Sequence, residues 1–276
     1  MRRSRFAMLG LLLAPAAACR LGFDSDDGAS SGRADAAAGD AAPGGLTVTA
    51  AQTTPLLSID GAGAGAGAVT FTSPTQAGQT VVVWVWLWAG GDTLVAPDAV
   101  TDSLGNVYSR AAAVELSAPQ CSSGAAAAGM YVGHVGTGGG GHTVTFTASG
   151  AAPSPQMTML ATAYDGLPAA TVRASLATPV AAAPSPMPLG TGALDVDAGG
   201  ALLVAVATEC AGYPGLVVWG TPAGWTARGT EPRTDGIAPG QAVDRVEPGP
   251  ARVSADWTVM FTGSPAPAAA ALAALR

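Results

Sequence analysis

Hydrophobic and polar positions alternate along short runs through most of the chain, and clusters of Gly, Pro, Asp and Ser separate these runs. In HTVTFTA, for example, Val144 and Phe146 fall on one face of an extended strand, and Thr143, Thr145 and Thr147 fall on the other. Such period-two alternation is typical of a β-strand with one packed face and one wetted face. The pattern therefore predicts strands in place of helices.

Runs of this kind recur between residues 46 and 262, and no long segment there has helical periodicity. They are LTVTA, AVTFTS, TVVVWVWLW, AAAVELS, GMYVGHV, HTVTFTA, MTMLATAYDG, ALLVAVATE, LVVWG, AVDRVEP and DWTVMFTG. Short strands separated by turn signals are typical of sheets packed face to face. We predict one all-β domain over residues 46–262, a two-sheet antiparallel sandwich of the jelly-roll or immunoglobulin-like kind.

The first eighteen residues have a different pattern. Arg2, Arg3 and Arg5 precede an apolar run of about ten residues, shorter than the roughly 20 residues of a membrane-spanning helix. Small residues then lead to Cys19. The segment resembles a bacterial lipobox, whose cysteine receives a diacylglyceryl group and becomes the mature N-terminus. The resemblance implies a lipoprotein signal peptide at 1–18.

An acylated Cys19 would partner with a lipid bilayer, because two or three acyl chains hold a protein firmly at a membrane. The expected location is therefore an exported, membrane-anchored lipoprotein at the outer membrane or cell surface. The alternative is an ordinary signal peptide in which Cys19 is incidental.

Two low-complexity segments flank the predicted domain. Residues 19–45 are rich in Ala, Gly, Ser and Asp, and such a segment buries too little apolar surface to offset the entropy of ordering it. We predict a flexible tether there. Residues 263–276, which end in SPAPAAAALAALR, are predicted to be an Ala/Pro-rich tail with a turn or two of helix or no order.

Composition restricts the partners. The chain has 38 Gly, 21 Pro and 11% charged residues, and all 12 basic residues are arginine. Its formal net charge is −7, and removal of the three signal-peptide arginines leaves about −10. Nucleic acid and anionic lipid headgroups would not be attracted to such a surface without a basic patch. We expect no nucleic-acid partner.

Cys121 and Cys210 remain once Cys19 is assigned to the anchor. Export places both thiols in an oxidising compartment, where two remaining cysteines commonly pair. Both lie beside turn-rich segments at the ends of predicted strands, where loops of a sandwich meet. We predict a Cys121–Cys210 disulfide; two separate thiols are the alternative.

Trp84, Trp86 and Trp88 share one face of the run TVVVWVWLW, because side chains alternate along a strand. Two interpretations remain open. If exposed, the three indoles would form a stacking platform for the rings of a polysaccharide. If buried, they would pack beneath a loop such as residues 61–67. Burial is favoured, because three exposed tryptophans make a large apolar patch for a soluble domain.

Several segments occur in an order that carries a resemblance. They are APDAVTDSLGNVYSR, GHTVTFTASG, MLATAYDGL, PAGWTARG, AVDRV and DWTVMF. They are similar to a widespread, poorly characterised family of secreted bacterial β-sandwich modules, which pair a D-S-x-G-N-x-Y turn with a later P-A-G-W-T segment. The resemblance implies a β-sandwich in an extracellular setting and carries no activity and no catalytic residues.

Two acidic segments raise the question of a metal site. Asp102 and Asn106, with a Gly105 that can adopt a positive φ, fit an Asx-turn between strands. The alternative is a Ca²⁺ site, but this turn has too few carboxylates to supply six to eight oxygen ligands. Asp195 and Asp197 are interpreted as a solvated strand end.

His134 and His142 flank the run VGTGGGG, and a hairpin centred on Gly138 would place them opposite each other. That is half a transition-metal site at most, so solvated strand ends are the preferred interpretation. The chain has no nucleophile elbow, Walker or dinucleotide-binding pattern. We therefore predict no catalytic residues, no cofactor and no metal site.

These observations favour a cell-envelope lipoprotein that presents a non-catalytic β-sandwich for binding or adhesion, with a polysaccharide or a surface protein as its partner. A purely structural envelope component is the alternative. A hydrolase is the least favoured, because Glu115, Asp165 and Glu209 are scattered singly along the chain.

Overall fold

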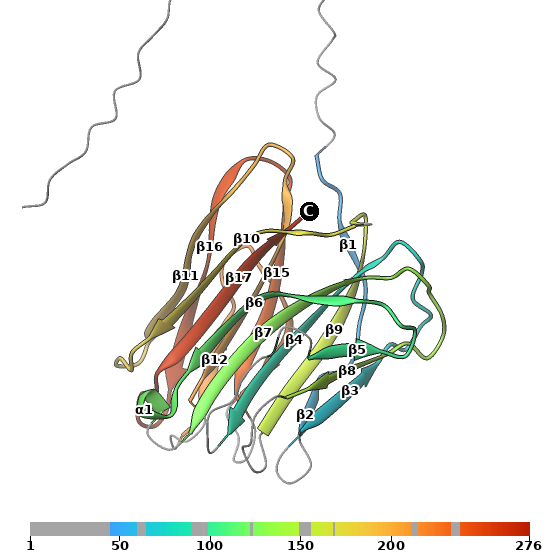
Figure 1. Ribbon diagram of the computed structural model, residues 1–276. Helices are drawn as coiled ribbons and strands as arrows, with labels where there is room; N and C mark the ends of the chain where they lie inside the picture. The colour runs from blue at the N-terminus through green and yellow to red at the C-terminus, as the bar shows by residue number, and fades with distance from the viewer. Residues whose placement is uncertain are drawn as a thin grey trace, which may run out of the picture. The chain divides into compact units, whose positions relative to one another are not determined.

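Seventeen antiparallel strands and one short helix make up the described part of the chain in the computed structural model (Figure 1). The structure describes residues 45–59, 65–89, 96, 99–121, 124–148, 156–167, 169–210, 215–232 and 238–276. The predicted signal peptide, Cys19 and all but the last residue of the predicted tether lie outside these ranges. The all-β antiparallel sandwich class is confirmed. Within the described ranges, no helix has the length and apolar character needed to cross a membrane.

The first half of the domain has one large sheet and one small sheet. The large sheet has the order β1-β9-β4-β7-β6, with β2 also paired to β9, and the small sheet has the order β3-β8-β5. The elements are β1 (Thr49–Thr53), β2 (Leu57–Ile59), β3 (Ala66–Thr70), β4 (Thr80–Ala89), β5 (Val100–Asp102), β6 (Tyr108–Leu116), α1 (Ala118–Cys121), β7 (Ala125–His134), β8 (Thr143–Thr147) and β9 (Gln156–Asp165).

The second half also has a large and a small sheet. The second large sheet has the order β10-β17-β12-β15-β14, and the second small sheet has the order β11-β16-β13. The elements are β10 (Val172–Val180), β11 (Met187–Val196), β12 (Ala201–Glu209), β13 (Val217–Gly220), β14 (Thr226–Glu231), β15 (Gly240–Glu247), β16 (Ala251–Phe261) and β17 (Ala268–Leu275).

The two halves have the same topology. If β1 and β3 to β9 are matched in chain order with β10 to β17, each sheet of one half has the strand order of its counterpart, and β2 alone among the described strands is unmatched. In each half the first and last strands are neighbours in the large sheet, as in a jelly roll. The two-sheet sandwich therefore occurs twice, whereas the sequence predicted it once.

Bulges in the large sheets fall at matching positions. The register shifts lie between Ala50 and Gln52 in β1, Val172 and Ala174 in β10, Arg110 and Ala112 in β6, and Ala227 and Gly229 in β14. Each pair of bulges aligns the two halves residue by residue. The alignment places the D-S-x-G-N-x-Y and P-A-G-W-T segments in equivalent turns, where Gly105 and Gly224 have φ values of 76° and 78°.

The two large sheets pack against each other, and the small sheets cover their outer faces. One hydrophobic cluster lies between the first large and first small sheets. A second, which we call the central hydrophobic cluster, joins both large sheets to the second small sheet. Across the central interface β6 lies by β10 and β17, whereas β9 lies by β14. The strand order is therefore reversed between the facing sheets, as expected for two equivalent halves related by a pseudo-two-fold axis.

The C-terminal segment corrects the predicted domain boundary. Residues 268–275 form β17, which pairs with β10 on one side and β12 on the other and is buried along its whole length (Figure 1). The prediction of a tail over 263–276 is therefore wrong. Alanine has the highest intrinsic helix propensity when tertiary contacts are absent. Its small side chain, however, also lets two packed sheets approach each other closely. Tertiary packing here overrides local propensity.

The predicted Cys121–Cys210 disulfide is present, with the two Cα atoms 5.3 Å apart. Cys121 ends α1, directly after β6 of the first half, and Cys210 follows β12 of the second. The bond therefore links the two halves covalently, and both of its residues are fully buried.

Candidate functional site

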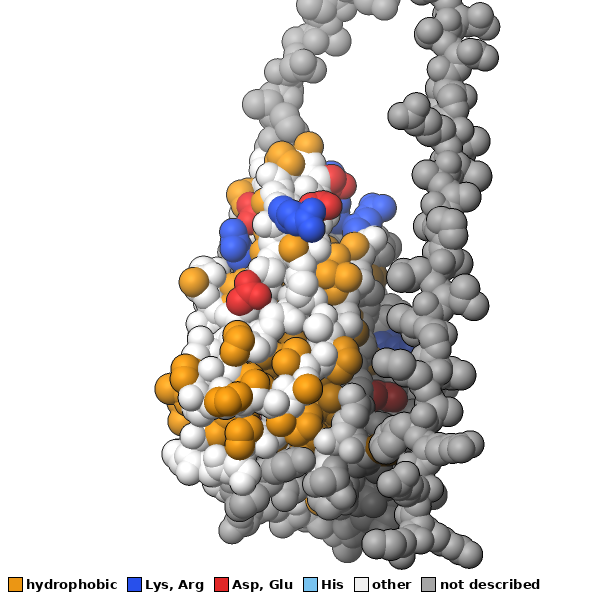
Figure 2. All heavy atoms as spheres, turned by 90° about the vertical axis from the view of Figure 1, so that its left-hand side faces the viewer, with side chains coloured by type: hydrophobic (Ala, Val, Ile, Leu, Met, Phe, Trp, Pro, Cys, Tyr) orange, Lys and Arg blue, Asp and Glu red, His pale blue; other side chains and the backbone are white. Residues whose placement is uncertain are grey.

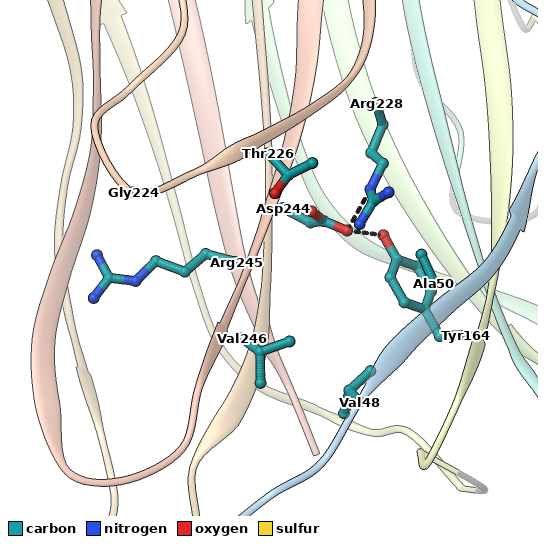
Figure 3. Close-up of a pocket in the computed structure, with 9 residues that line it drawn as sticks. All are labelled: Val48, Ala50, Tyr164, Gly224, Thr226, Arg228, Asp244, Arg245 and Val246. Carbon is teal, nitrogen blue, oxygen red and sulfur yellow. Dashed lines mark hydrogen bonds and ion pairs between the residues drawn. The ribbon is translucent and has the colours of Figure 1, made fainter.

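A cavity of about 310 Å³ opens at one edge of the central interface, where β1 and β9 of the first half meet β14 and β15 of the second (Figure 3). Its lining residues are Val48, Ala50, Tyr164, Gly224, Thr226, Arg228, Asp244, Arg245 and Val246. Its volume lies at the lower end of the range for small-molecule sites.

Three polar side chains converge in the cavity. The Tyr164 hydroxyl donates a hydrogen bond to Oδ2 of Asp244, and Nε of Arg228 donates to the same oxygen over 2.7 Å. The guanidinium carbon of Arg228 also lies 5.9 Å from the centre of the Tyr164 ring. Tyr164 and Asp244 are buried, whereas the Arg228 side chain keeps 22% of its surface exposed. We call these three residues the polar trio.

The strand pattern explains how each member reaches the cavity. Arg228 is the extra residue of the β14 bulge, so its side chain departs from the alternation of its neighbours. Asp244 occupies an inward position of β15, in the run AVDRV, and Tyr164 lies one residue before the end of β9. A carboxylate at an inward strand position is costly unless it is paired, and Arg228 and Tyr164 supply the partners.

The cavity sets the protonation of its polar groups. Burial, reinforced by the negative charge of Asp244, raises the pKa of Tyr164 well above its usual value, so the phenol stays neutral. For Arg228, burial lowers the pKa, but the hydrogen bond to Asp244 and the other interactions with Asp244 and Tyr164 together outweigh burial and raise it. The site therefore holds a neutral phenol beside an ion pair.

Arg245 contributes differently from the trio. Its side chain extends away from the other polar groups (Figure 3), and its Nη2 atom lies 2.7 Å from a carboxylate oxygen of Glu247. Its charge is therefore compensated outside the cavity.

The structure rejects the stacking platform proposed for the tryptophan strand. Trp84 and Trp86 are fully buried, and Trp88 is partly buried. A Cβ atom added at Gly240 would lie only 2.9 Å from Cγ and Cδ1 of Trp86, so this indole packs directly on the β15 backbone. The alternative of burial is correct, and the second large sheet covers Trp86. Most of the loop at 61–67, which the sequence suggested as the cover, lies outside the described residues.

The predicted Asx-turn is confirmed. Oδ1 of Asp102 accepts the backbone N–H groups of Leu104 and Asn106, both over 2.9 Å. Oδ2 accepts hydrogen bonds from the Asn106 amide, the Tyr108 hydroxyl and Nε2 of His142. Burial alone would raise the pKa of Asp102, but these hydrogen bonds outweigh it and lower the pKa. Protein donors thus occupy both oxygens that a Ca²⁺ ion would need.

The two histidines do not face each other. His134 ends β7 in the large sheet, whereas His142 precedes β8 in the small sheet, so the glycine-rich segment crosses between sheets and does not form a hairpin. His134 is exposed, as predicted, but His142 is fully buried. The expectation of two solvated strand ends is therefore wrong for His142.

His142 joins a hydroxyl to a carboxylate, an arrangement that the sequence did not reveal. Its Nε2 atom bonds to Asp102 over 2.8 Å, and its Nδ1 atom bonds to the Thr75 hydroxyl over 2.9 Å. Because a carboxylate only accepts, Nε2 carries the proton of the bond to Asp102. All three side chains are buried, so this chain of bonds acts as a clamp between loops.

The remaining acidic candidates stay apart. Asp195 and Asp197 lie at an exposed strand end beside Arg252 and Arg276, as predicted. Glu115, Asp165 and Glu209 lie on three different strands. In the described ranges, no group of three or more His, Cys, Asp or Glu side chains is arranged to hold a metal ion.

The outer face of the second small sheet carries an apolar patch. Figure 2, which looks from the side where β11 and β16 lie in Figure 1, shows hydrophobic side chains gathered on one part of this face and charged ones on another. Leu216, Val218 and Met260 are between 41% and 45% exposed. The cavity, by contrast, brings charged and hydroxyl groups together, and we place the candidate ligand site there.

Sequence reasoning missed all three members of the polar trio. Asp244 left the clearest signal, as a carboxylate inside an otherwise apolar strand run. Arg228 left none, because its position depends on a bulge, and Tyr164 read as an ordinary strand residue.

Comparison of the chain with protein-family models, with curated proteins and with solved structures gave no match. The most informative reference for the cavity is therefore the other half of the same domain. The matching bulges align Arg228 with Ala111, Asp244 with Val132, and Tyr164 with Leu275. These three apolar residues are buried members of the central hydrophobic cluster. Apolar side chains thus close one edge of the central interface, whereas the polar trio lies at the equivalent position of the other edge.

Proposed function

We propose that the protein is a non-catalytic binding module of the cell envelope and that the cavity at the central interface is its ligand site. The observation that carries the proposal is the difference between two equivalent positions of one fold. Ala111, Val132 and Leu275 are sufficient to close the interface at one edge. The equivalent position thus closes without polar residues, and a polar cluster beside a cavity favours recognition of a ligand.

The proposed location rests on the N-terminal sequence and on the disulfide. A signal peptide ending at Cys19 would export the chain and anchor it through acyl chains. The buried Cys121–Cys210 bond supports this setting, because such bonds persist in oxidising compartments. The resemblance to secreted β-sandwich modules points the same way.

A non-catalytic role is favoured by the state of the most enzyme-like group. Thr75, His142 and Asp102 form a hydroxyl–imidazole–carboxylate chain, but each of these side chains is buried and each polar atom is already bonded within the protein. A nucleophile must reach its substrate, and this hydroxyl is closed off from solvent.

The test is a binding screen with a variant designed from the protein itself. In the apolar-seam variant, Tyr164→Leu, Arg228→Ala and Asp244→Val together copy the residues of the equivalent edge. Mature isotope-labelled protein would be titrated with neutral sugars, sugar acids and amino acids while amide chemical shifts are followed by NMR. We expect at least one class to shift the Thr226 and Val246 amides saturably, with no such shift in the variant. If no class shifts them, the cavity is not the ligand site.

A purely structural envelope component is the second candidate, favoured by the burial of Trp84 and Trp86. This role needs the domain intact but the cavity unused. Cells carrying the apolar-seam variant would then match the wild type in envelope integrity and in every binding assay, whereas cells lacking the protein would not.

The anchor has its own test. Mass spectrometry of the mature N-terminus should find an acylated Cys19, and the protein should fractionate with membranes. Cys19→Ser should release it into the soluble fraction. An unmodified or internal N-terminus would disprove lipidation without affecting the cavity proposal.

A further inference from the structure

We infer that the cavity recognises a single neutral sugar unit in preference to an acidic one, an inference that rests on the proposed function. Arg228 and Asp244 would hold two adjacent hydroxyl groups of the sugar. Three properties of the cavity support this ligand class: its charge balance, its hydrogen-bonding groups and its apolar wall.

Charge balance disfavours an anion. The guanidinium of Arg228 is already paired with Asp244, and the Tyr164 phenol adds no charge. Arg245, the other cation of the lining, pairs with Glu247 and points away from the trio (Figure 3). The carboxylate of a sugar acid would therefore meet Asp244 with no spare positive charge to offset the repulsion. The formal net charge of −7 acts in the same direction.

The hydrogen-bonding groups suit hydroxyls. A guanidinium has five N–H donors, and the bond to Asp244 uses the one on Nε. The hydrogen bonds from Tyr164 and Arg228 both end on Oδ2 of Asp244, so Oδ1 takes part in neither of them. A sugar hydroxyl both donates and accepts. Two neighbouring hydroxyls can therefore accept from Arg228 and donate to Asp244, in the charge-assisted bonds that give polar sites their strength.

The cavity also has an apolar wall of suitable extent. Val48, Ala50 and Val246 line it beside the trio, and Val246 is 37% exposed. The C–H face of a sugar ring can lie against such a surface while its hydroxyls reach the polar side. With a volume of about 310 Å³, the cavity has room for one ring but not for a chain.

The experiment compares matched pairs of ligands on the mature full chain. Methyl glycosides of glucose, galactose and mannose would be titrated beside the corresponding uronic-acid glycosides, and affinity would be measured by NMR at fixed ionic strength. We expect one neutral glycoside to bind at least about tenfold more tightly than its acidic partner. Equal or tighter binding of the acid would overturn the inference.

Asp244→Asn provides a specificity test within the site. The substitution keeps the shape of the side chain but leaves Arg228 as an unpaired cation. We expect the preference to reverse, with the uronic acid gaining affinity and the neutral glycoside losing it. An unchanged preference would overturn the inference, whereas circular dichroism and thermal unfolding would show whether the variant is folded.

Failure of this inference can be told apart from failure of the proposed function. If amino acids or sugar acids shift the cavity amides and neutral sugars do not, the ligand class is wrong and the binding site remains. If no ligand of the screen shifts them, both proposals fail.

Discussion

Arg228 and Ala111 occupy the same position in two copies of one fold: each is the extra residue of the bulge on the strand at the edge of its large sheet. Ala111 is buried in the central hydrophobic cluster, whereas Arg228 reaches into a cavity and pairs with Asp244. Because the strand order and the register shift are the same at both places, we attribute the difference to the side chains. The repeat thus provides an internal control for the contribution of a polar cluster to stability.

The polar trio is expected to contribute little net stability. Replacing a buried ion pair with apolar residues of suitable volume is often neutral or stabilising, because the desolvation of both charges is avoided. The apolar-seam variant should therefore unfold at the wild-type temperature or above it. Arg228→Ala alone should cost about 3 kcal/mol, since Asp244 would be left buried without its cation. Thermal and chemical unfolding of both variants would check this; a strongly destabilised triple variant would show that the trio is needed by the fold.

Trp86→Ala should cost about 3–5 kcal/mol, as is typical of truncating a buried tryptophan. The reason is its full burial against Gly240 of the facing sheet. Trp88→Ala is the matched control and should cost less, because Trp88 is only partly buried. Urea unfolding of the two variants would measure the difference. A loss of stability no larger than that of Trp88→Ala would contradict this prediction.

Removal of the Cys121–Cys210 bond should destabilise the fold by up to about 4–5 kcal/mol in the chain-entropy model. The two cysteines are 89 residues apart in the chain, so the bond closes a long loop and also joins the two halves. Chemical unfolding of a Cys121→Ser/Cys210→Ser protein would measure the loss. Peptide mapping without reductant should recover the two cysteine peptides linked, and free thiols at both positions would contradict the assignment.

Asp102 should make stability depend on acid pH. Its pKa is lowered in the folded protein, so the unfolded state takes up a proton more readily. The resulting stabilisation is complete above the unfolded pKa of about 3.9 and is lost as the pH falls through the lower folded value. Asp102→Asn should therefore be less stable than wild type at pH 7, with the gap narrowing below about pH 4. Asp195→Asn, at an exposed position, should follow the wild-type curve.

A charge placed in β17 should prevent folding. Ala271 is fully buried and pairs with both β10 and β12, so Ala271→Asp would bury an unpaired carboxylate at the centre of a sheet. Ala193→Asp is the control, since Ala193 is exposed on β11. We expect soluble, folded protein from the control only. Normal folding of Ala271→Asp would show that the C-terminal strand is dispensable.

Period-two alternation was enough to predict the β class and most of the longer strands. In HTVTFTA, Val144 and Phe146 are buried as the pattern indicated. The Asx-turn at Asp102 was equally predictable, because its side chain bonds to backbone groups within four residues. The disulfide was inferred from cysteine number and expected export, without geometry. The strands and the Asx-turn were thus predictable because they depend on residues close together in the sequence. The disulfide was predictable because cysteines commonly pair in an oxidising compartment.

Only the tertiary structure decided which strands meet. The alanine-rich segment at 268–275 became a central strand because β10 and β12 flank it, and Trp86 was buried against Gly240, which lies far away in the sequence. The polar trio likewise joins one residue of the first half to two of the second. A sequence pattern indicates which face of a strand is buried, but partners depend on how the chain folds back on itself. Both the repeat and the cavity at its interface arise from those long-range pairings.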